Sequence, residues 1–187
     1  MSRDFKNDVL EASIKCFGRY GYKKTTINDI CKEANVARQT LYNCFNSKAD
    51  ILTGALIYSA DKSINSIKNK INSNTSFKKK LQLFCDEIVK GYIITQQSPA
   101  AKDLLDRNLP IDKSAQQKVD SQFCELIVSF IAPYKKNIES IGLDIKEFAD
   151  LIYVSLRTVK YGATNVDHLK KLHASCITFL VSQLKLN

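Results

Sequence analysis

The chain has 187 residues, a length typical of one domain or of a small module joined to a second one. Hydrophobic residues make up 44% and charged residues 25%, which excludes a disordered chain, and no apolar run approaches the about 18 residues of a membrane span. The net charge is +9, and residues 1–80 carry +8 of it, from 15 Lys and Arg against 7 Asp and Glu. This asymmetry favours a polyanionic partner, either nucleic acid or a membrane surface.

The beginning of the chain and its cysteines indicate a reducing compartment. The first twelve residues, MSRDFKNDVLEA, lack the apolar stretch of a secretory signal, so we expect a cytoplasmic protein. No C-x-x-C pair occurs among the six cysteines, which lie in apolar periodic stretches at positions 16, 31, 44, 85, 124 and 176. They are therefore expected to be core thiols, and neither a metal site nor a cofactor is expected.

Apolar residues recur at spacings of three and four along nearly the whole chain, and glycine and proline together number only nine. This pattern predicts an all-α protein of about nine helices. The first helix carries an apolar stripe from Phe5 to Tyr20. It is expected to end at Gly21, because glycine readily adopts the left-handed conformation that follows a helix.

Two S/T-x-x-D signals predict helix starts, because the hydroxyl and the carboxylate of this pattern satisfy free backbone N–H groups. The first, Thr26-Ile-Asn-Asp29, begins a short helix that a tight turn at Asn35-Val36 ends. Residues 38–45 predict a second short helix, and Ser47-Lys-Ala-Asp50 begins a long helix over 47–71. Two short helices joined by a tight turn form a helix-turn-helix at about 26–45, whose second helix can enter a DNA major groove.

A polar break at 72–76 separates the long helix from five further helical segments. They are expected from residue 77 to before Pro99, around 102–107, through 123–130 toward Pro133, over 145–162 and over 166–185. The whole pattern predicts an N-terminal helix-turn-helix domain over 1–48 and a C-terminal helical domain over 49–187, joined by the helix 47–71. Lysines at 68, 70 and 78–80 lie outside the helix-turn-helix, where a solvated face accounts for them.

About 50 residues at fixed spacings carry a family resemblance: Phe17, Gly21, Tyr22, Thr25, Thr26, Ile27, Ile30, Ala34 and Val36, then Leu41, Tyr42, Phe45, Lys48, Ile51 and Leu52. This run resembles the tetracycline-repressor (TetR) family of bacterial transcription regulators. The resemblance implies an N-terminal DNA-binding domain and C-terminal helices that dimerise the chain and bind a small effector. The other residues are similar to that family only in helix count and length.

Three positions of the motif are expected to contact the DNA backbone. Thr26 caps a helix and so places its hydroxyl and the positive helix end beside a phosphate. The resemblance implies that the Tyr42 hydroxyl reaches another phosphate. Lys48 stands where an ammonium group and a helix N-terminus converge on one anion.

Base recognition is expected from the second short helix. Its exposed positions are Arg38, Gln39, Thr40 and Asn43, and arginine pairs best with guanine while glutamine and asparagine pair with adenine. Which of the four contact bases stays open without an operator sequence. Ala37 departs from the Ser or Thr that is frequent in the family, and the alanine lacks a cap worth ~1 kcal/mol.

The C-terminal domain offers candidates for two further sites. For an effector pocket they are the apolar and aromatic positions Phe84, Ile88, Tyr92, Phe123, Ile127, Phe130 and Tyr153. For a dimer interface, a four-helix bundle formed by the last two helices of each chain, they are Leu151, Ile152, Ser155, Val159, Leu169, Leu172, Cys176 and Leu180. Ordinary core packing is the alternative for every position in both sets.

These features predict a homodimeric, sequence-specific DNA-binding regulator, a repressor that a small molecule releases from its operator. An activator and a helical interaction module that keeps the motif for packing alone are the alternatives. No paired carboxylates, nucleophile–base set, Gly-rich phosphate loop or metal-ligand spacing occurs, so an enzyme is not expected.

Overall fold

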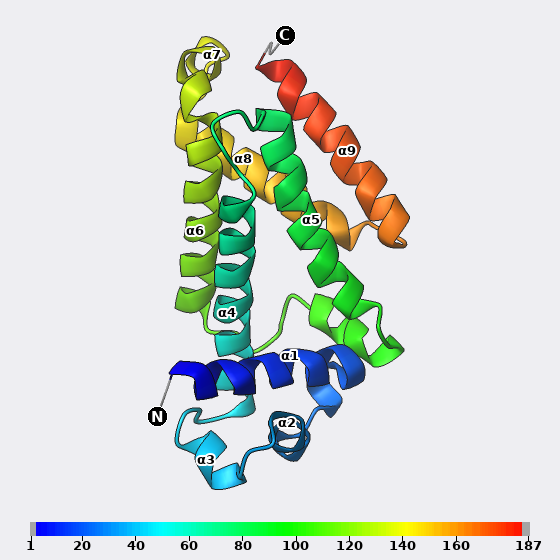
Figure 1. Cartoon of the computed structure of the whole chain (residues 1–187). Coiled ribbons are helices and arrows are strands. Elements are labelled where there is room, and N and C mark those ends of the chain that lie inside the picture. Colours follow the sequence, from blue (N-terminus) through cyan, green and yellow to red (C-terminus); the bar gives the residue numbers. More distant parts are fainter. Residues whose placement is uncertain (1–2, 185–187) are drawn as a thin grey trace. The chain divides into compact units, whose positions relative to one another are not determined.

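The computed structural model describes residues 3–184 and contains only helices in this range (Figure 1). Nine of them are α-helices: α1 Arg3–Lys24, α2 Ile27–Ala34, α3 Arg38–Tyr42, α4 Lys48–Asn69, α5 Phe77–Thr95, α6 Lys113–Ile131, α7 Lys135–Ser140, α8 Ile145–Thr158 and α9 Val166–Gln183. Three 3₁₀ segments lie between them, η1 Pro99–Leu105, η2 Ala132–Tyr134 and η3 Val159–Tyr161. The predicted all-α class is confirmed. No helix in the described range is long and apolar enough to cross a membrane.

The chain packs as two compact units, each built from two stretches of sequence. Unit 1 comprises the chain up to Lys62 together with Ile93–Val119, and unit 2 comprises Ser63–Tyr92 together with the chain from Asp120 onward. The long helices α4 and α5 contribute to both units. Packing therefore divides the chain differently from the expected boundary at residue 48, which stays a prediction about functional domains.

The core of unit 1 is small and contains the apolar side chains expected there. Phe17, Ile30, Leu41 and Phe45 are at most 3% exposed and belong to one cluster with side chains of α4 such as Ile51. Helices as short as α2 and α3 are marginal alone, so this cluster is what holds them in place. Burying each such side chain contributes about 1.5–3 kcal/mol.

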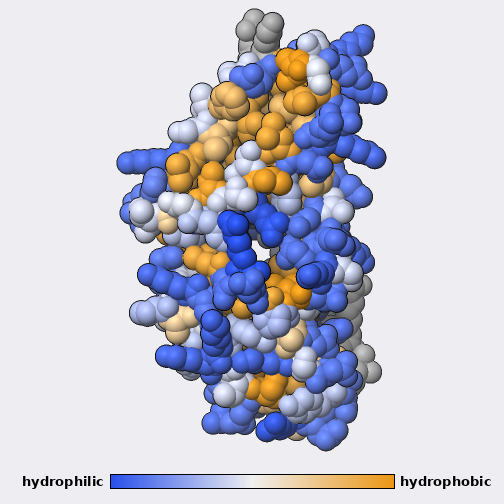
Figure 2. Space-filling view, turned by 180° about the vertical axis from the view of Figure 1, so that it is seen from behind, coloured by the Kyte–Doolittle hydropathy of each residue, from blue (hydrophilic) through white to orange (hydrophobic). Residues whose placement is uncertain are grey.

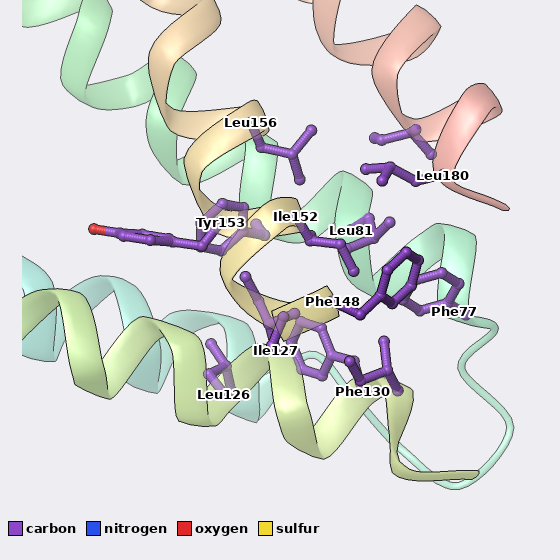
Figure 3. Packing of buried hydrophobic residues seen from close by; sticks show 14 of the residues in the cluster. Phe77, Leu81, Leu126, Ile127, Phe130, Phe148, Ile152, Tyr153, Leu156 and Leu180 are labelled. Atoms are coloured by element: carbon purple, nitrogen blue, oxygen red, sulfur yellow. The ribbon is translucent and has the colours of Figure 1, made fainter. Parts of the chain in front are cut away.

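The core of unit 2 is larger and joins side chains from α5, α6, α8 and α9 (Figure 3). Its fully buried members include Leu81, Ile127, Phe148, Ile152 and Leu156. Tyr153 lies at its margin, and Figure 3 shows its hydroxyl turned away from the other labelled side chains. The core thus holds the four helices together, and the Tyr153 hydroxyl is a polar group at its edge.

Two helices end earlier than their apolar patterns predicted. The helix α3 stops at Tyr42 instead of residue 45, and the backbone N–H groups of Cys44 and Phe45 both bind the Leu41 carbonyl in a tight turn. The helix α8 stops at Thr158, and a 3₁₀ turn continues to Tyr161. Apolar periodicity persists through such turns, so it overestimates helix length.

Proline acts on α6 as predicted. The helix ends at Ile131, and Pro133 lies in the 3₁₀ segment that follows. The short helix α7, Lys135–Ser140, comes directly afterwards and was missed, because it buries only Ile138 and carries no apolar repeat.

Candidate nucleic-acid interface

Thr26 begins α2 with a complete capping box, as its S/T-x-x-D signal predicted. The Asp29 N–H donates to Thr26 Oγ1 over 3.2 Å, and the Asp29 carboxylate accepts from the Thr26 N–H (2.9 Å) and from the Thr26 hydroxyl (2.7 Å). These bonds favour the ionised carboxylate and lower the pKa of Asp29. The threonine hydroxyl is thus already engaged, so the helix N-terminus itself is the part of this position that faces an anion freely.

The turn between α2 and α3 is fixed by Asn35. This residue has φ 53° and ψ 49°, a left-handed conformation that asparagine tolerates better than most residues. The backbone N–H of Val36 then reaches the Cys31 carbonyl over 2.9 Å, which closes the end of α2. The predicted tight turn is therefore confirmed, and it sets the direction in which α3 leaves.

The helix α3 has its inner side anchored and its N-terminus uncapped. Leu41 is fully buried, and Phe45 is buried just beyond the helix, with the Lys6 ammonium 5.2 Å from its ring centre. Ala37 at the N-cap makes no side-chain hydrogen bond, as predicted from its missing hydroxyl. The side chains of α3 that face outward are therefore held by two buried anchors.

The structure brings the predicted base-contacting residues together on this outward side. Arg38, Gln39, Tyr42 and Asn43 are exposed, while Thr40 is half-buried. Arg38 donates to the Tyr42 hydroxyl oxygen over 3.4 Å, and the Gln39 amide donates to Asn43 over the same distance. Because the tyrosine oxygen accepts in this pair, its O–H remains a donor for an outside group.

Lys48 makes contacts within unit 1 that the sequence did not predict. Its ammonium donates to the backbone carbonyls of Tyr22 (2.8 Å), Lys23 (3.3 Å) and Thr25 (2.9 Å), and it lies 4.5 Å from the centre of the Tyr22 ring. An ammonium group has three donors, and all three are used. In this structure Lys48 joins the start of α4 to the end of α1, and the phosphate contact of its ammonium stays a prediction.

Two further residues shape this site, and sequence reasoning missed their contacts. The buried Thr25 hydroxyl donates to the Gly21 carbonyl over 2.6 Å. From η1, Asp103 accepts the backbone N–H groups of Tyr22 and Lys23, each over 2.8 Å. No local pattern pairs Asp103 with residues 80 positions away, so the sequence carried no signal for it.

Gly21 is required where α1 meets η1. Its φ of 75° and ψ of 163° interrupt the helix, in agreement with the predicted stop. A Cβ atom at this position would lie 2.2 Å from the Ala100 carbonyl oxygen and 2.9 Å from the Asp103 carboxylate. Only glycine combines this conformation with such a close approach of two backbones.

A family model described as bacterial regulatory proteins, tetR family, matches residues 9–55, which contain the helix-turn-helix and its buried anchors. Residues 9–55 therefore form a domain of the tetR family.

Two uncharacterized HTH-type transcriptional regulators of Bacillus subtilis (strain 168) are similar to this chain. YhgD is 43% identical over 51 residues, or 27% of each protein. YuxN is 30% identical over 115 residues, which are 58% of this chain and 37% of YuxN. The chain thus matches well under half the length of either relative.

Solved structures share the fold over nearly the whole chain. FadR from Bacillus subtilis, a transcriptional regulator solved with stearoyl-CoA, has a TM-score of 0.67 at 20% identity, and the match covers 95% of this chain and 98% of FadR. A TetR transcription regulator from Haloarcula marismortui ATCC 43049 has a TM-score of 0.71 at 16% identity, with 97% and 98% covered. The chain therefore shares the fold of these two structures through its C-terminal helices.

Three of the effector-pocket candidates form one aromatic cluster in unit 2. Phe123 stacks on Tyr153 with 5.9 Å between ring centres, and Phe84 meets both rings edge-on at 5.6 and 6.3 Å. The Tyr153 hydroxyl donates to Asp120 over 2.5 Å, and Arg157 binds the same carboxylate oxygen over 3.0 Å. Burial and this bond raise the pKa of Tyr153, so the phenol stays protonated.

The other four candidates lie in or beside the core of unit 2. Ile127 and Phe130 are buried, and Ile88 packs against them from a half-buried position. Tyr92 is buried and donates its hydroxyl to the Ala163 carbonyl over 3.1 Å. A pocket between α5 and α9 is lined by none of the seven candidates, so their role in effector binding stays a prediction.

The dimer candidates divide into buried and accessible side chains. Ile152, Leu169 and Leu180 are at most 3% exposed. They are part of the single chain's own core, which corrects the expectation that they line an interface. Leu151 is 48% exposed, and the half-buried candidates are Ser155, Val159, Leu172 and Cys176. The interface prediction did not include Val154 and Phe179, which are 54% and 62% exposed on the same two helices.

Proposed function

We propose that this protein is a sequence-specific DNA-binding transcription regulator that reads DNA with the outward side of α3. The observation that carries the proposal is the exposed set Arg38, Gln39, Tyr42 and Asn43 on a helix whose opposite side is fixed by the buried Leu41. A helix-turn-helix that served only for packing would not require these exposed polar side chains. The tetR-family domain and the exposed side of α3 together therefore favour DNA binding over a helical interaction module.

The two kinds of DNA contact fall to different residues. The free O–H of Tyr42 supports a phosphate contact, which fixes the position of the protein without distinguishing sequences. The guanidinium of Arg38 and the amides of Gln39 and Asn43 have the donor patterns that distinguish guanine and adenine in the major groove. Thr40, half-buried, supports the same helix from its side.

The active form is proposed to be a homodimer that pairs α8 and α9 across a two-fold axis. Large apolar side chains remain exposed on these helices, Leu151, Val154 and Phe179. Figure 2 shows apolar side chains gathered in the upper part of the face that it displays. A two-fold axis would present two α3 helices to half-sites about 34–36 Å apart on a near-palindromic operator.

Repression is proposed to end when a small effector binds to the C-terminal helices. Effector binding that disfavours the DNA-bound spacing of the two α3 helices corresponds to a coupling free energy of about 1–3 kcal/mol. An activator would use the same residues, and the position of its sites relative to promoters would distinguish it.

Selection of bound fragments from the genome of the source organism tests the proposal. We expect enrichment of a near-palindromic sequence, and gel-shift affinity for that sequence should fall steeply with salt, because several phosphates are neutralised per subunit. Binding without sequence preference and with a flat response to salt would contradict the proposal. A scrambled fragment of equal length and composition is the control.

A further inference from the structure

Helices α5 and α9 of unit 2 enclose a pocket of about 370 Å³, near the lower end of the size range of ligand sites. Three lysines line it, Lys78 and Lys79 from α5 and Lys170 from α9. Asp86 is the one carboxylate among the lining residues. With a neutral imidazole at His173, the lining carries an excess of two positive charges.

These three ammonium groups have no partner within residues 3–184, unlike other lysines near the same helix. Glu87 accepts Lys90 over 2.6 Å and lies 3.8 Å from Lys70. By contrast, no carboxylate or hydrogen-bond acceptor in that range pairs with the ammonium groups of Lys78, Lys79 and Lys170. The sequence predicted a solvated face for the lysines at 78–80. Two of these three lysines, Lys78 and Lys79, line a pocket instead.

The positions of Lys78 and Lys79 are unfavourable for the chain by itself. Both lie in the first turn of α5, which contains no acidic residue, and Ser76 caps that turn by accepting the Lys79 N–H over 3.3 Å. The positive end of a helix repels cations. A bound anion would remove this repulsion, so the charge arrangement favours an anionic occupant.

The imidazole of His173 supplies a second, independent indication of a ligand. It is 3% exposed and lines the pocket, and its Nε2 lies 2.9 Å from the Leu156 carbonyl oxygen. A carbonyl oxygen only accepts, so Nε2 carries the proton and Nδ1 is an acceptor. This Nδ1 is buried and has no hydrogen-bond partner in the described chain. Leaving such an atom unpaired is unfavourable, because it loses its bonds to water on burial and gains none in return.

Part of the pocket wall is apolar. Cys85, Val89 and Ile177 line it and are at most 8% exposed. Burial raises the pKa of the Cys85 thiol, so this side chain is neutral and adds no charge. An occupant therefore meets cations at the rim, an apolar wall within and one unused acceptor.

We propose that this pocket binds a small organic anion that carries a carboxylate or phosphate group, an apolar body and a hydroxyl or amino donor. The anionic group binds Lys78, Lys79 and Lys170, the body covers the apolar wall, and the donor reaches His173 Nδ1. The inference goes beyond the proposed function, because anion binding is measured without DNA and its failure is separate from a failure of DNA binding.

Calorimetric titration of the full chain with matched probes tests the chemistry. The probes are 4-hydroxybenzoate, 4-hydroxyphenyl phosphate, the uncharged 4-hydroxybenzamide and inorganic phosphate. We expect saturable binding of at least one aromatic anion, and binding about tenfold weaker or more for both the amide and inorganic phosphate. Equal binding of the uncharged amide would overturn the anionic assignment, and equal binding of inorganic phosphate would overturn the role of the apolar wall.

Variants locate the binding site. The double variant Lys78→Gln/Lys79→Gln and the single variant Lys170→Gln should each weaken binding of the aromatic anion about tenfold. The control is Lys171→Gln, an exposed lysine beside Lys170 that does not line the pocket, and it should leave affinity within about twofold. Unchanged affinity in the pocket variants, or an equal loss in the control, would place binding elsewhere and overturn the proposal.

Nitrogen NMR of the imidazole provides a readout that does not depend on substitution. In the free protein, His173 should show a protonated Nε2 and an unprotonated Nδ1, and burial lowers the pKa of this histidine, which favours that neutral form. A probe that donates to Nδ1 should shift the Nδ1 resonance on saturation, whereas benzoate, which lacks the hydroxyl, should shift it less. An Nδ1 resonance that moves equally with both probes would overturn the assigned contact.

Discussion

Lys48 stabilises the end of one helix from the beginning of another. The last carbonyl groups of α1 lack partners within the helix, and a cation at this end is favourable because the helix dipole is negative there. A single ammonium satisfies two of these groups, the carbonyls of Tyr22 and Lys23, and also binds the carbonyl of Thr25 just beyond the helix. The residue therefore holds the helices of this domain together.

Replacing Lys48 by methionine should lower the free energy of unfolding by about 1–3 kcal/mol, because charged hydrogen bonds to three carbonyls are lost. Chemical denaturation of the variant measures this loss. Lys24→Met is the control, because Lys24 is exposed on the same surface, and it should change stability by less than about 0.5 kcal/mol. Unchanged stability with weakened DNA binding in Lys48→Met would instead support the original phosphate contact.

The outward side chains of α3 should separate affinity from specificity. Tyr42→Phe removes one phosphate donor and should weaken binding to all DNA sequences alike. Gln39→Ala should lose about 1–3 kcal/mol on the selected operator and relax the preference at particular base pairs. Gel-shift titrations against operators with single base changes measure both effects.

Tyr20→Phe is the control for the tyrosine, because Tyr20 is equally exposed but lies on α1. It should leave DNA affinity unchanged. A sequence-dependent loss in Tyr42→Phe would mean that the hydroxyl contacts a base, against the proposed division of roles.

At the scale of elements, unit 1 depends on η1 for the end of α1. Asp103 holds two backbone N–H groups beyond the interruption at Gly21, and Lys23 lies 3.6 Å from Asp106 at the end of the same segment. Because Asp106 is partly exposed and Lys23 largely so, this ion pair contributes little, and the hydrogen bonds from the backbone to Asp103 carry the stabilisation. The position of α1 thus depends on contacts with neighbouring residues in the sequence and on contacts with the distant segment η1.

Gly21→Ala should destabilise unit 1 strongly, by about 3 kcal/mol or more, because it combines an unfavourable φ with a clash against the Ala100 carbonyl. Gly142→Ala is a matched control. Its φ is also positive, 83°, but its new Cβ would meet no atom within 4 Å, so it isolates the cost of the backbone conformation alone. Thermal unfolding should show a much larger loss for Gly21→Ala, and equal losses would exclude the clash as the cause.

Local chemistry predicted the parts of this site that depend on neighbouring residues. The caps at Thr26 and Ser47, the turn at Asn35 and the stop at Gly21 follow from patterns a few residues long. Contacts between residues far apart in the sequence could not be predicted in this way. Neither the two hydrogen bonds of Asp103 nor the three hydrogen bonds of Lys48 have a local sequence pattern. In unit 2 the apolar periodicity located the helices but could not distinguish core from surface, and so Ile152, Leu169 and Leu180 were assigned to an interface.

At the scale of the whole molecule, the charge imbalance has two separate explanations. Arg38 is exposed on α3 within the strongly basic N-terminal part, as a DNA-binding surface requires. Lys78 and Lys79 belong instead to the pocket of unit 2. The surface of α8 and α9 carries exposed apolar side chains instead, and its proposed role is self-association.

Phe179→Lys should convert the proposed dimer to a monomer, because it places a charge in an apolar interface that the two-fold axis repeats. Sedimentation equilibrium measures the change as a weakening of self-association of about a hundredfold or more. Ile93→Lys is the control, since it alters an apolar side chain of unit 1 that is 45% exposed, and it should leave association unchanged. A wild-type chain that sediments as a monomer would contradict the dimer.

The discontinuous make-up of unit 1 constrains how this protein can be recombined with others. A chimera that joins the first 62 residues to a foreign C-terminal half would lack the segment Ile93–Val119, and with it Asp103 and the backbone at Ala100. The end of α1 would then lose two hydrogen-bond acceptors and the surface against which Gly21 packs. A working exchange of DNA specificity must therefore transplant two sequence segments together, or be confined to the few outward side chains of α3.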